Sequence, residues 1–215
     1  MHSGDQLAQP EFHLRYEAYP EDAKFELIGG VVHMASPMRG PHGLYTSELH
    51  GLFFLYKVAT PGVEAPENIT TILGPRSEPQ PDLMLRLQRE YGGQSDYDED
   101  QYLRGAPELV AEVAHSTVAL DMHGKRDDYL AAGVLEYVVL CVAEGEIHWH
   151  HFPSKRKLKP DRAGVYKSRA FPGLWLDGPA LIARDSARLI ATLQRGLASP
   201  QHAEFIQTLE GRRGK

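Results

Sequence analysis

Residues 107–114 have the sequence Pro-Glu-Leu-Val-Ala-Glu-Val-Ala, a short apolar run with one carboxylate, Glu112, set inside it. Gly105 bounds the run on one side, and His115-Ser116-Thr117 bounds it on the other. A continuous apolar run of this length predicts a strand that is buried on both faces of a sheet. Because an ionised carboxylate in such a strand is costly unless it is paired or binds a metal, Glu112 is the first candidate for a functional residue.

A second acid, Asp82, follows Gln80-Pro81 and opens the apolar run Leu83-Met84-Leu85. If the two runs form adjacent strands, Asp82 and Glu112 can converge on a hard divalent ion such as Mg²⁺, which prefers oxygen ligands. The alternative is that each acid caps a strand end or pairs with a surface lysine. A metal site requires the two carboxylates to lie close together, with a lysine amine nearby.

The composition of the 215-residue chain, with 42% hydrophobic and 24% charged residues, is that of one globular domain. No apolar stretch approaches the length of a membrane span, and the N-terminus lacks the basic and apolar regions of a signal peptide. The single Cys141 excludes an intrachain disulfide and lies in an apolar run, which predicts a buried, inert thiol. We therefore expect a cytoplasmic location.

The net charge of −6 does not indicate nucleic-acid binding, which usually requires a strongly basic surface. The charge is nevertheless uneven, because residues 97–100 form an acidic cluster and residues 155–169 are locally basic. The simplest interpretation of each segment is a solvated surface. The basic segment could alternatively contact a phosphate backbone.

The order of the predicted elements indicates an α/β (α+β) fold in which a central mixed sheet is flanked by helices. A helix before Pro20 precedes a hairpin with a Gly29-Gly30 turn, as two-residue hairpins require. The remaining elements are a helix over 41–59, strands over 63–73 and from Asp82, a long exposed loop over 88–106, a helix over 121–132 ended by Gly133, strands over 135–142 and 147–152, a hairpin near 155–170, and C-terminal helices from Pro179 to Ser199 and near Phe205.

Lys125 is a candidate catalytic residue because it follows Glu112 on the next predicted helix. Asp121, Lys125 and Tyr129 are spaced four apart and therefore share one helix face. A lysine beside a bound metal can hold the attacking water or stabilise charge on a phosphoryl oxygen. The alternatives are a surface pair between Lys125 and a neighbouring aspartate, and a surface salt bridge for Glu26, a further candidate acid beside the hairpin turn.

Histidines supply further candidates. His148 and His150 share one face of a predicted strand, so a two-histidine metal site is geometrically feasible, although an exposed strand face is the simpler interpretation. His42 lies in the first turn of a helix, where it could contact substrate or be an ordinary helix-start residue. The sequence contains no Gly-rich phosphate loop, nucleophile elbow or cysteine cluster.

Several of these features occur along the chain in the order and spacing of a known protein family. They are Phe25-Glu26-Leu27-Ile28-Gly29-Gly30-Val31-Val32-His33-Met34-Ala35-Ser36-Pro37, His42, Pro81-Asp82, Leu109-Val110-Ala111-Glu112-Val113, Ser116-Thr117, Asp121, Lys125, Arg126, Tyr129, Gly133 and Glu136-Tyr137. In this order and spacing, over roughly residues 12–178, the chain resembles the Uma2-like family (DUF820), a branch of the PD-(D/E)XK restriction-endonuclease-like superfamily.

The resemblance implies a nuclease-type domain over residues 1–178, with a C-terminal helical extension over 179–215 packed on it. It also implies that Asp82 and Glu112 bind Mg²⁺ or Mn²⁺, with the Val113 carbonyl as an additional ligand. Glu26 would be an auxiliary ligand or a water-orienting group. The implied reaction is metal-assisted hydrolysis of a DNA phosphodiester bond. By analogy, two copies could associate through the C-terminal helices.

Two departures from the superfamily pattern affect this expectation. The motif lysine should lie two residues after Glu112, but that position is Ala114, and Lys125 is the candidate replacement. His115 stands where the family tends to have Ser before a Pro. We therefore keep two hypotheses: a metal-dependent endonuclease in which Asp82, Glu112, Lys125 and Glu26 are catalytic, and an inactive binding or assembly module with the same fold.

Overall fold

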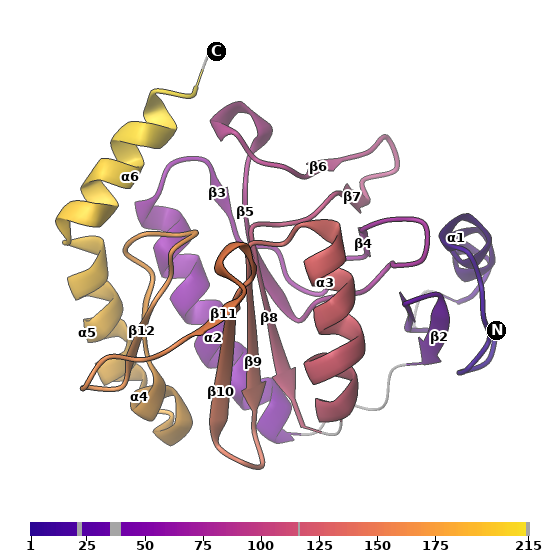
Figure 1. Cartoon of the computed structure of the whole chain (residues 1–215), viewed down its shortest axis with the longest axis horizontal. Coiled ribbons are helices and arrows are strands. Elements are labelled where there is room, and N and C mark those ends of the chain that lie inside the picture. Colours follow the sequence, from indigo (N-terminus) through magenta and orange to yellow (C-terminus); the bar gives the residue numbers. More distant parts are fainter. Residues whose placement is uncertain (21–22, 35–39, 116, 214–215) are drawn as a thin grey trace.

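The computed structural model describes residues 1–20, 23–34, 40–115 and 117–213 (Figure 1). Residues 35–37 and Ser116, which contribute to the sequence motifs above, lie outside the described residues.

A six-stranded mixed sheet lies at the centre of the molecule, in the order β11-β10-β9-β8-β5-β3 (Figure 1). Strands β8 and β9 run parallel, whereas the other neighbouring pairs are antiparallel. The strands are β3 (Val63–Glu64), β5 (Leu83–Leu87), β8 (Leu109–Ala114), β9 (Glu136–Cys141), β10 (Glu146–His151) and β11 (Arg156–Leu158).

Strand β8 is buried along its whole length, which confirms the strand predicted from residues 107–114. Its alternate side chains enter two different cores, as the pleat of a strand requires. Leu109, Ala111 and Val113 pack on one side with residues of the helix over 40–59, whereas Val110 and Ala114 pack on the other side with Tyr129. Since Glu112 lies between Val110 and Ala114, its side chain is on the Tyr129 side of the sheet.

Helices cover both faces of this sheet (Figure 1). Helix α2 (Gly40–Ala59) lies behind it in the view shown, and α3 (Arg126–Ala132) lies in front. The segment before α3, Leu120–Lys125, is a π-helical turn rather than the regular helix expected from sequence. Gly133 ends α3 with a φ of 96°, which confirms the predicted left-handed cap.

The N-terminal part forms a small unit beside the sheet. Helix α1 (Gln9–Glu17) precedes strands β1 (Phe25–Ile28) and β2 (Val31–Met34), which pair as the predicted hairpin. Gly29 and Gly30 have φ angles of 60° and 83°, so the turn needs the two glycines. This unit has a hydrophobic cluster of its own, made of Phe12, Phe25, Leu27 and Val32.

Three further predicted segments differ in the structure. The hairpin expected near 155–170 does not form, because residues 156–158 pair with β10 and residues 165–167 pair with residues 175–177. The strand expected over 63–73 is two strands, β3 and β4 (Thr71–Ile72), which belong to different sheets. The loop expected over 88–106 contains a short 3₁₀ helix, η1 (Arg89–Tyr91), and two strands, β6 (Asp96–Tyr97) and β7 (Leu103–Arg104). Because β7 pairs with both β4 and β6, this segment is held in a three-stranded sheet.

The C-terminal part adds a second layer on the α2 side. A 3₁₀ turn, η3 (Phe152–Ser154), is followed by the hairpin of β12 (Val165–Lys167) and β13 (Trp175–Asp177) and by helices α4 (Gly178–Ala183), α5 (Ser186–Leu197) and α6 (Pro200–Glu210). Leu189, Leu193 and Leu209 enter the same core as α2. The division into a domain over 1–178 and an extension over 179–215 stays a prediction.

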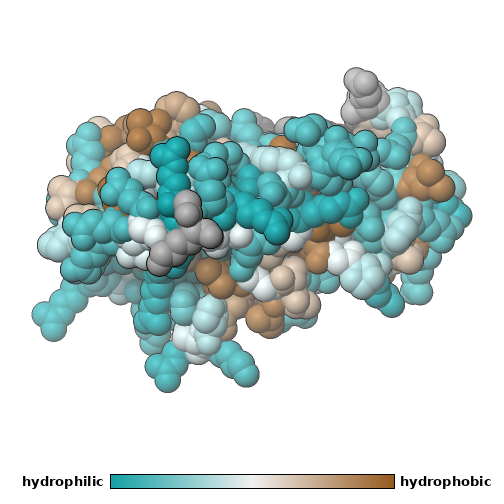
Figure 2. Space-filling view, turned by 90° about the horizontal axis from the view of Figure 1, so that it is seen from above, coloured by the Kyte–Doolittle hydropathy of each residue, from teal (hydrophilic) through white to brown (hydrophobic). Residues whose placement is uncertain are grey.

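The face seen in Figure 2 is mostly hydrophilic, with separate, smaller hydrophobic areas. Across the described ranges, no helix is both long enough and apolar enough to cross a membrane.

Candidate active site

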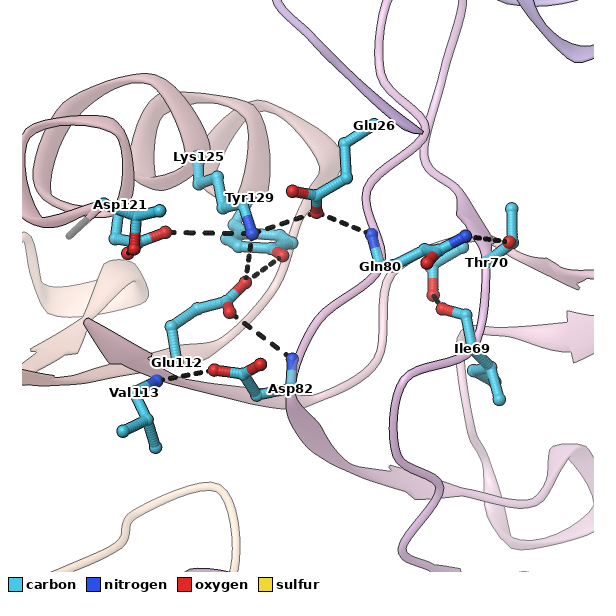
Figure 3. A network of polar contacts seen from close by, with 12 residues as sticks. Glu26, Ile69, Thr70, Gln80, Asp82, Glu112, Val113, Asp121, Lys125 and Tyr129 are labelled. Carbon is cyan, nitrogen blue, oxygen red and sulfur yellow. Dashed lines mark hydrogen bonds and ion pairs between the residues drawn. The ribbon is translucent and has the colours of Figure 1, made fainter. Parts of the chain in front are cut away.

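The predicted acids meet at the end of the sheet where β8 finishes and β5 begins (Figure 3). The register of this antiparallel pair explains the meeting, because Leu83 is opposite Ala111 and so brings Asp82 next to Glu112. The amide nitrogen of Val113 donates to Oδ2 of Asp82 (2.8 Å), and the amide of Asp82 is 3.4 Å from Oε2 of Glu112. Both side chains therefore lie side by side at one edge of the core.

Lys125 reaches these acids from the following helix. Its Nζ atom lies 2.9 Å from Oε1 of Glu26, 3.1 Å from Oε1 of Glu112 and 3.7 Å from Oδ1 of Asp121. The lysine is only 6% exposed, and it ends the π-helical turn that leads into α3. Such turns are often found at functional sites, and here the turn directs a long side chain back over the end of β8.

Glu26 joins the site from the N-terminal hairpin. Its Oε1 atom accepts a hydrogen bond from the amide nitrogen of Gln80 (2.8 Å) as well as the contact from Lys125. Gln80 lies two residues before Asp82, so this bond attaches the hairpin to the segment that carries the first acid. The structure thus brings together Glu26, Asp82, Glu112 and Lys125, the four side chains predicted to be catalytic (Figure 3).

Tyr129 and Asp121 complete the arrangement, although the sequence indicated only that they share a helix face with Lys125. The Tyr129 hydroxyl donates to Oε1 of Glu112 (2.8 Å), and Thr117 donates to Asp121. All three residues of the shared face are buried. The spacing of four residues was the available signal, whereas the bond from Tyr129 to the candidate ligand depends on how α3 packs against β8.

His42 contacts two of the three proposed metal ligands. Its Nδ1 atom lies 2.8 Å from the Val113 carbonyl oxygen, so this nitrogen carries a hydrogen and donates it. The Nε2 atom lies 3.3 Å from Oδ1 of Asp82. His42 belongs to the first turn of α2, which therefore contributes a side chain to the site as well as packing under the sheet.

The histidines on β10 form no comparable site. His148 is paired with Glu146 (3.2 Å) and contacts Lys157, whereas His150 stacks on Tyr137. Burial lowers the pKa of His150 to about 4. The two side chains thus have separate environments on the strand.

Among the described residues of the candidate site, carboxyl groups outnumber the single lysine. Burial lowers the pKa of Lys125, but the carboxylates of Glu112, Glu26 and Asp121 outweigh burial and hold that pKa well above its usual range. Burial, together with the neighbouring acids, raises the pKa of Glu112 well above its ordinary value despite the lysine. One ammonium group therefore does not balance the surrounding carboxylates, and an additional cation would be stabilised here.

The Asp82 carboxyl shows the effect of its histidine neighbour. Burial raises its pKa, but the hydrogen bond and charge of His42, together with the Val113 amide and Lys125, outweigh burial and lower the pKa overall. Conversely, the hydrogen bond to Asp82 raises the pKa of His42. Asp82 is consequently more readily ionised than Glu112 and Asp121, whose pKa values burial raises.

The donor set fits a hard divalent cation. Asp82, Glu112 and the Val113 carbonyl supply oxygen donors on two neighbouring strands, and oxygen is the donor that Mg²⁺ and Mn²⁺ prefer. In the part of the chain that the structure describes, no three His, Cys, Asp or Glu side chains form a ready-made metal centre. Mg²⁺ does not require one, because it usually binds through one or two carboxylates and keeps several waters.

The comparisons with known proteins agree with the fold. A family model, Uma2, described as "Putative restriction endonuclease", matches residues 10–179. The chain is also similar to a crystal structure described as "a putative nuclease belonging to DUF820" from Anabaena variabilis ATCC 29413. That likeness has a TM-score of 0.61 at 14% identity and covers 78% of this chain and 95% of the other, so it shows a shared fold.

No curated protein matches the chain. The family match nevertheless extends over most of its length and includes every candidate site residue. It confirms the resemblance found in the sequence, and the mixed sheet flanked by helices confirms the expected fold class. The chain belongs to the Uma2 family, whose description is "Putative restriction endonuclease".

Proposed function

We propose that the protein is a metal-dependent endonuclease that hydrolyses phosphodiester bonds in DNA. The observation that carries the proposal is the position of Lys125. Its ammonium group forms ion pairs with Glu112 and Glu26, next to Asp82. The family and the similar fold support a nuclease-like activity. The excess of carboxylates supports the requirement for a divalent cation.

Each side chain has a distinct part in the proposed reaction. Asp82 and Glu112, with the Val113 carbonyl, would hold Mg²⁺ or Mn²⁺. When bound, such an ion lowers the pKa of water and neutralises charge that develops on the phosphoryl group. Lys125 is protonated, so it would donate hydrogen bonds to the attacking water or to a phosphoryl oxygen rather than remove a proton. Glu26 and Tyr129 would keep Lys125 and Glu112 in position.

The overall chemistry is a hydrolysis. The water oxygen forms a bond to phosphorus, and the bond from phosphorus to one sugar oxygen breaks. The leaving oxygen takes up a proton from solvent, and the attacking water loses one to solvent.

A second candidate function follows from the same contacts. In the structure, Lys125 is already in contact with three carboxylates, as expected for a buried ion-pair network that only stabilises the fold. The protein would then be an inactive binding or assembly module. A homodimer and a cytoplasmic location stay predictions under either hypothesis.

The test is a titration of Mg²⁺ and Mn²⁺ against cleavage of plasmid and single-stranded DNA. The wild type is compared with Asp82→Asn, Glu112→Gln and, as a control, Glu99→Gln on the exposed acidic segment. Metal binding is measured separately by calorimetry. We expect metal-dependent cleavage by the wild type and the control, and a loss of about 10²–10³-fold in the two site variants. Equal activity in all four proteins would assign the cleavage to a contaminant and favour the inactive module.

A further inference from the structure

A groove adjoins the candidate active site on the side of α2. It has a volume of about 320 Å³ and lies between the first turns of that helix and the segment before β5. Its lining includes His42, Thr46, Ser47, His50, Glu67 and Asn68.

The groove and the candidate metal site share a wall. His42 lines the groove and lies 3.3 Å from Oδ1 of Asp82 through its Nε2 atom. Asn68 also lines the groove, and its backbone amide nitrogen donates to the carbonyl oxygens of Pro81 (3.0 Å) and Asp82 (3.3 Å). A chain of atoms lying in the groove would therefore pass directly beside Asp82.

The polar groups of the groove suit an anionic ligand. Thr46, Ser47 and Asn68 are neutral hydrogen-bonding side chains. Glu67, the one acid in the described lining, is bound by His50, whose Nδ1 atom is 2.6 Å from Oε2. One end of the groove lies at the first turn of α2, where His42 and Gly43 are located and where the helix dipole favours negative charge.

The groove contains fewer acidic side chains than the neighbouring candidate active site. The four carboxyl groups of the candidate active site disfavour a polyanion that approaches over them, whereas the groove lining, as far as the structure describes it, holds one acid, Glu67, which His50 contacts. Its volume is at the lower end of the range for small-ligand sites, which suits a single nucleotide unit rather than a duplex.

We propose that this groove holds one strand of the nucleic acid substrate, by the sugar–phosphate unit next to the scissile phosphate. Ser47 and Asn68 would donate hydrogen bonds to phosphate or sugar oxygens, contacts that position a strand without selecting its sequence. The proposal rests on the proposed nuclease function and adds where the substrate strand lies.

The experiment uses one variant that fills the groove with a larger side chain and one that removes a polar side chain from it. Neither variant changes an acid of the candidate active site. Ser47 is exposed on α2, so Ser47→Tyr places a ring over the groove while the helix is kept. Asn68 has a φ of 51°, so Asn68→Gly removes the amide group without straining the backbone. Val58→Tyr, at an exposed position near the other end of α2, is the matched control. Binding of fluorescein-labelled single-stranded and duplex DNA is measured by anisotropy, Mn²⁺ binding by calorimetry, and folding by thermal denaturation.

We expect Ser47→Tyr to weaken DNA binding and kcat/KM by about tenfold or more, which corresponds to about 1.4 kcal/mol. Asn68→Gly should weaken them less, and Val58→Tyr should leave them unchanged. Mn²⁺ binding and thermal stability should be unchanged in all three variants. If Ser47→Tyr binds and cleaves DNA like the wild type, the groove assignment is overturned while the nuclease proposal stands. If the wild type binds neither DNA, both proposals are overturned.

Discussion

The Nζ atom of Lys125 lies 3.1 Å from Oε1 of Glu112, although the lysine belongs to the helical segment after the strand that carries the glutamate. In the superfamily pattern, a lysine would reach the same acid from two residues further along the strand, where this chain has Ala114. The π-helical turn over Leu120–Lys125 makes the alternative route feasible. We infer that Lys125 is the replacement for the motif lysine, with its ammonium beside the same acid.

The first prediction is that Lys125→Met lowers kcat for DNA cleavage by about 10²–10³-fold, because the charged donor to the reacting phosphoryl group is lost. Mn²⁺ binding should be equal or tighter, since a positive charge beside the ligands is removed. Single-turnover cleavage and calorimetry measure the two effects.

A second substitution tests the replacement idea directly. Ala114 and Glu112 lie on the same face of β8, so Ala114→Lys places an ammonium on the side of the sheet that Lys125 occupies. In the Lys125→Met background it should restore cleavage by at least about tenfold, provided that thermal denaturation shows a folded protein. A Lys125→Met variant as active as the wild type would contradict the catalytic role.

The second prediction concerns metal and stability. Because the site has an excess of carboxylates, a divalent ion should bind the folded state preferentially and stabilise it. At a concentration about 100-fold above Kd, the gain is about 2.7 kcal/mol, or roughly 5–10 °C in Tm for a chain of this length. Scanning calorimetry with MnCl₂, and again after addition of a chelator, measures the shift. An equally large shift in Asp82→Asn would place the ion elsewhere.

The fold was predictable where burial and periodicity agree. The apolar run around Glu112 and the helix over 41–59 have patterns that a single strand or helix face explains. The segment 63–73 was predicted wrongly because it contains Pro66 and Asn68, which interrupt one extended strand, and because β4 pairs with β7 about thirty residues later. A single sequence carries no local signal for such a distant pairing.

The candidate site was predictable only where local spacing or a sequence motif indicated a residue. Spacing placed Asp121, Lys125 and Tyr129 on one face, and the family motifs indicated the acids. The contacts of His42 depend instead on where α2 passes beneath the end of β8. Those of Glu26 depend on how the hairpin docks against Gln80. Both are tertiary relationships between segments that are far apart in the chain.

The third prediction is that Tyr129→Phe weakens metal binding. The Tyr129 hydroxyl donates to Oε1 of Glu112 at 2.8 Å, and both groups are buried. Removing the donor leaves that oxygen with the lysine contact alone, so Glu112 is less well oriented. We expect about a 10–100-fold loss in Mn²⁺ affinity and about 1–3 kcal/mol less unfolding free energy. Tyr137→Phe, which removes a bond to the Asp121 carbonyl instead, is the control, and an equal loss of affinity there would deny Tyr129 its specific role.

The fourth prediction uses a buried acid, Glu78, which lies four residues before Asp82 in the sequence. Glu78 accepts hydrogen bonds from Gln9 (2.7 Å) and lies 2.8 Å from His13, but burial outweighs these contacts and raises its pKa above the ordinary value of 4.5. The folded state therefore binds this proton more tightly than the unfolded state. Stability from this group is present below pH 4.5 and is lost as the pH rises through the raised pKa.

Glu78→Gln removes the ionisation while keeping a side chain of the same shape. The difference in Tm between the variant and the wild type should therefore move in favour of the variant as the pH rises from about 4 to about 7.5. Thermal denaturation followed by circular dichroism measures this difference. Glu11→Gln, an exposed acid on the same N-terminal helix that contacts Glu78, should show no such trend. A difference that is constant with pH, or that moves in favour of the wild type, would mean that the contacts from Gln9 and His13 stabilise the ionised form more than burial destabilises it.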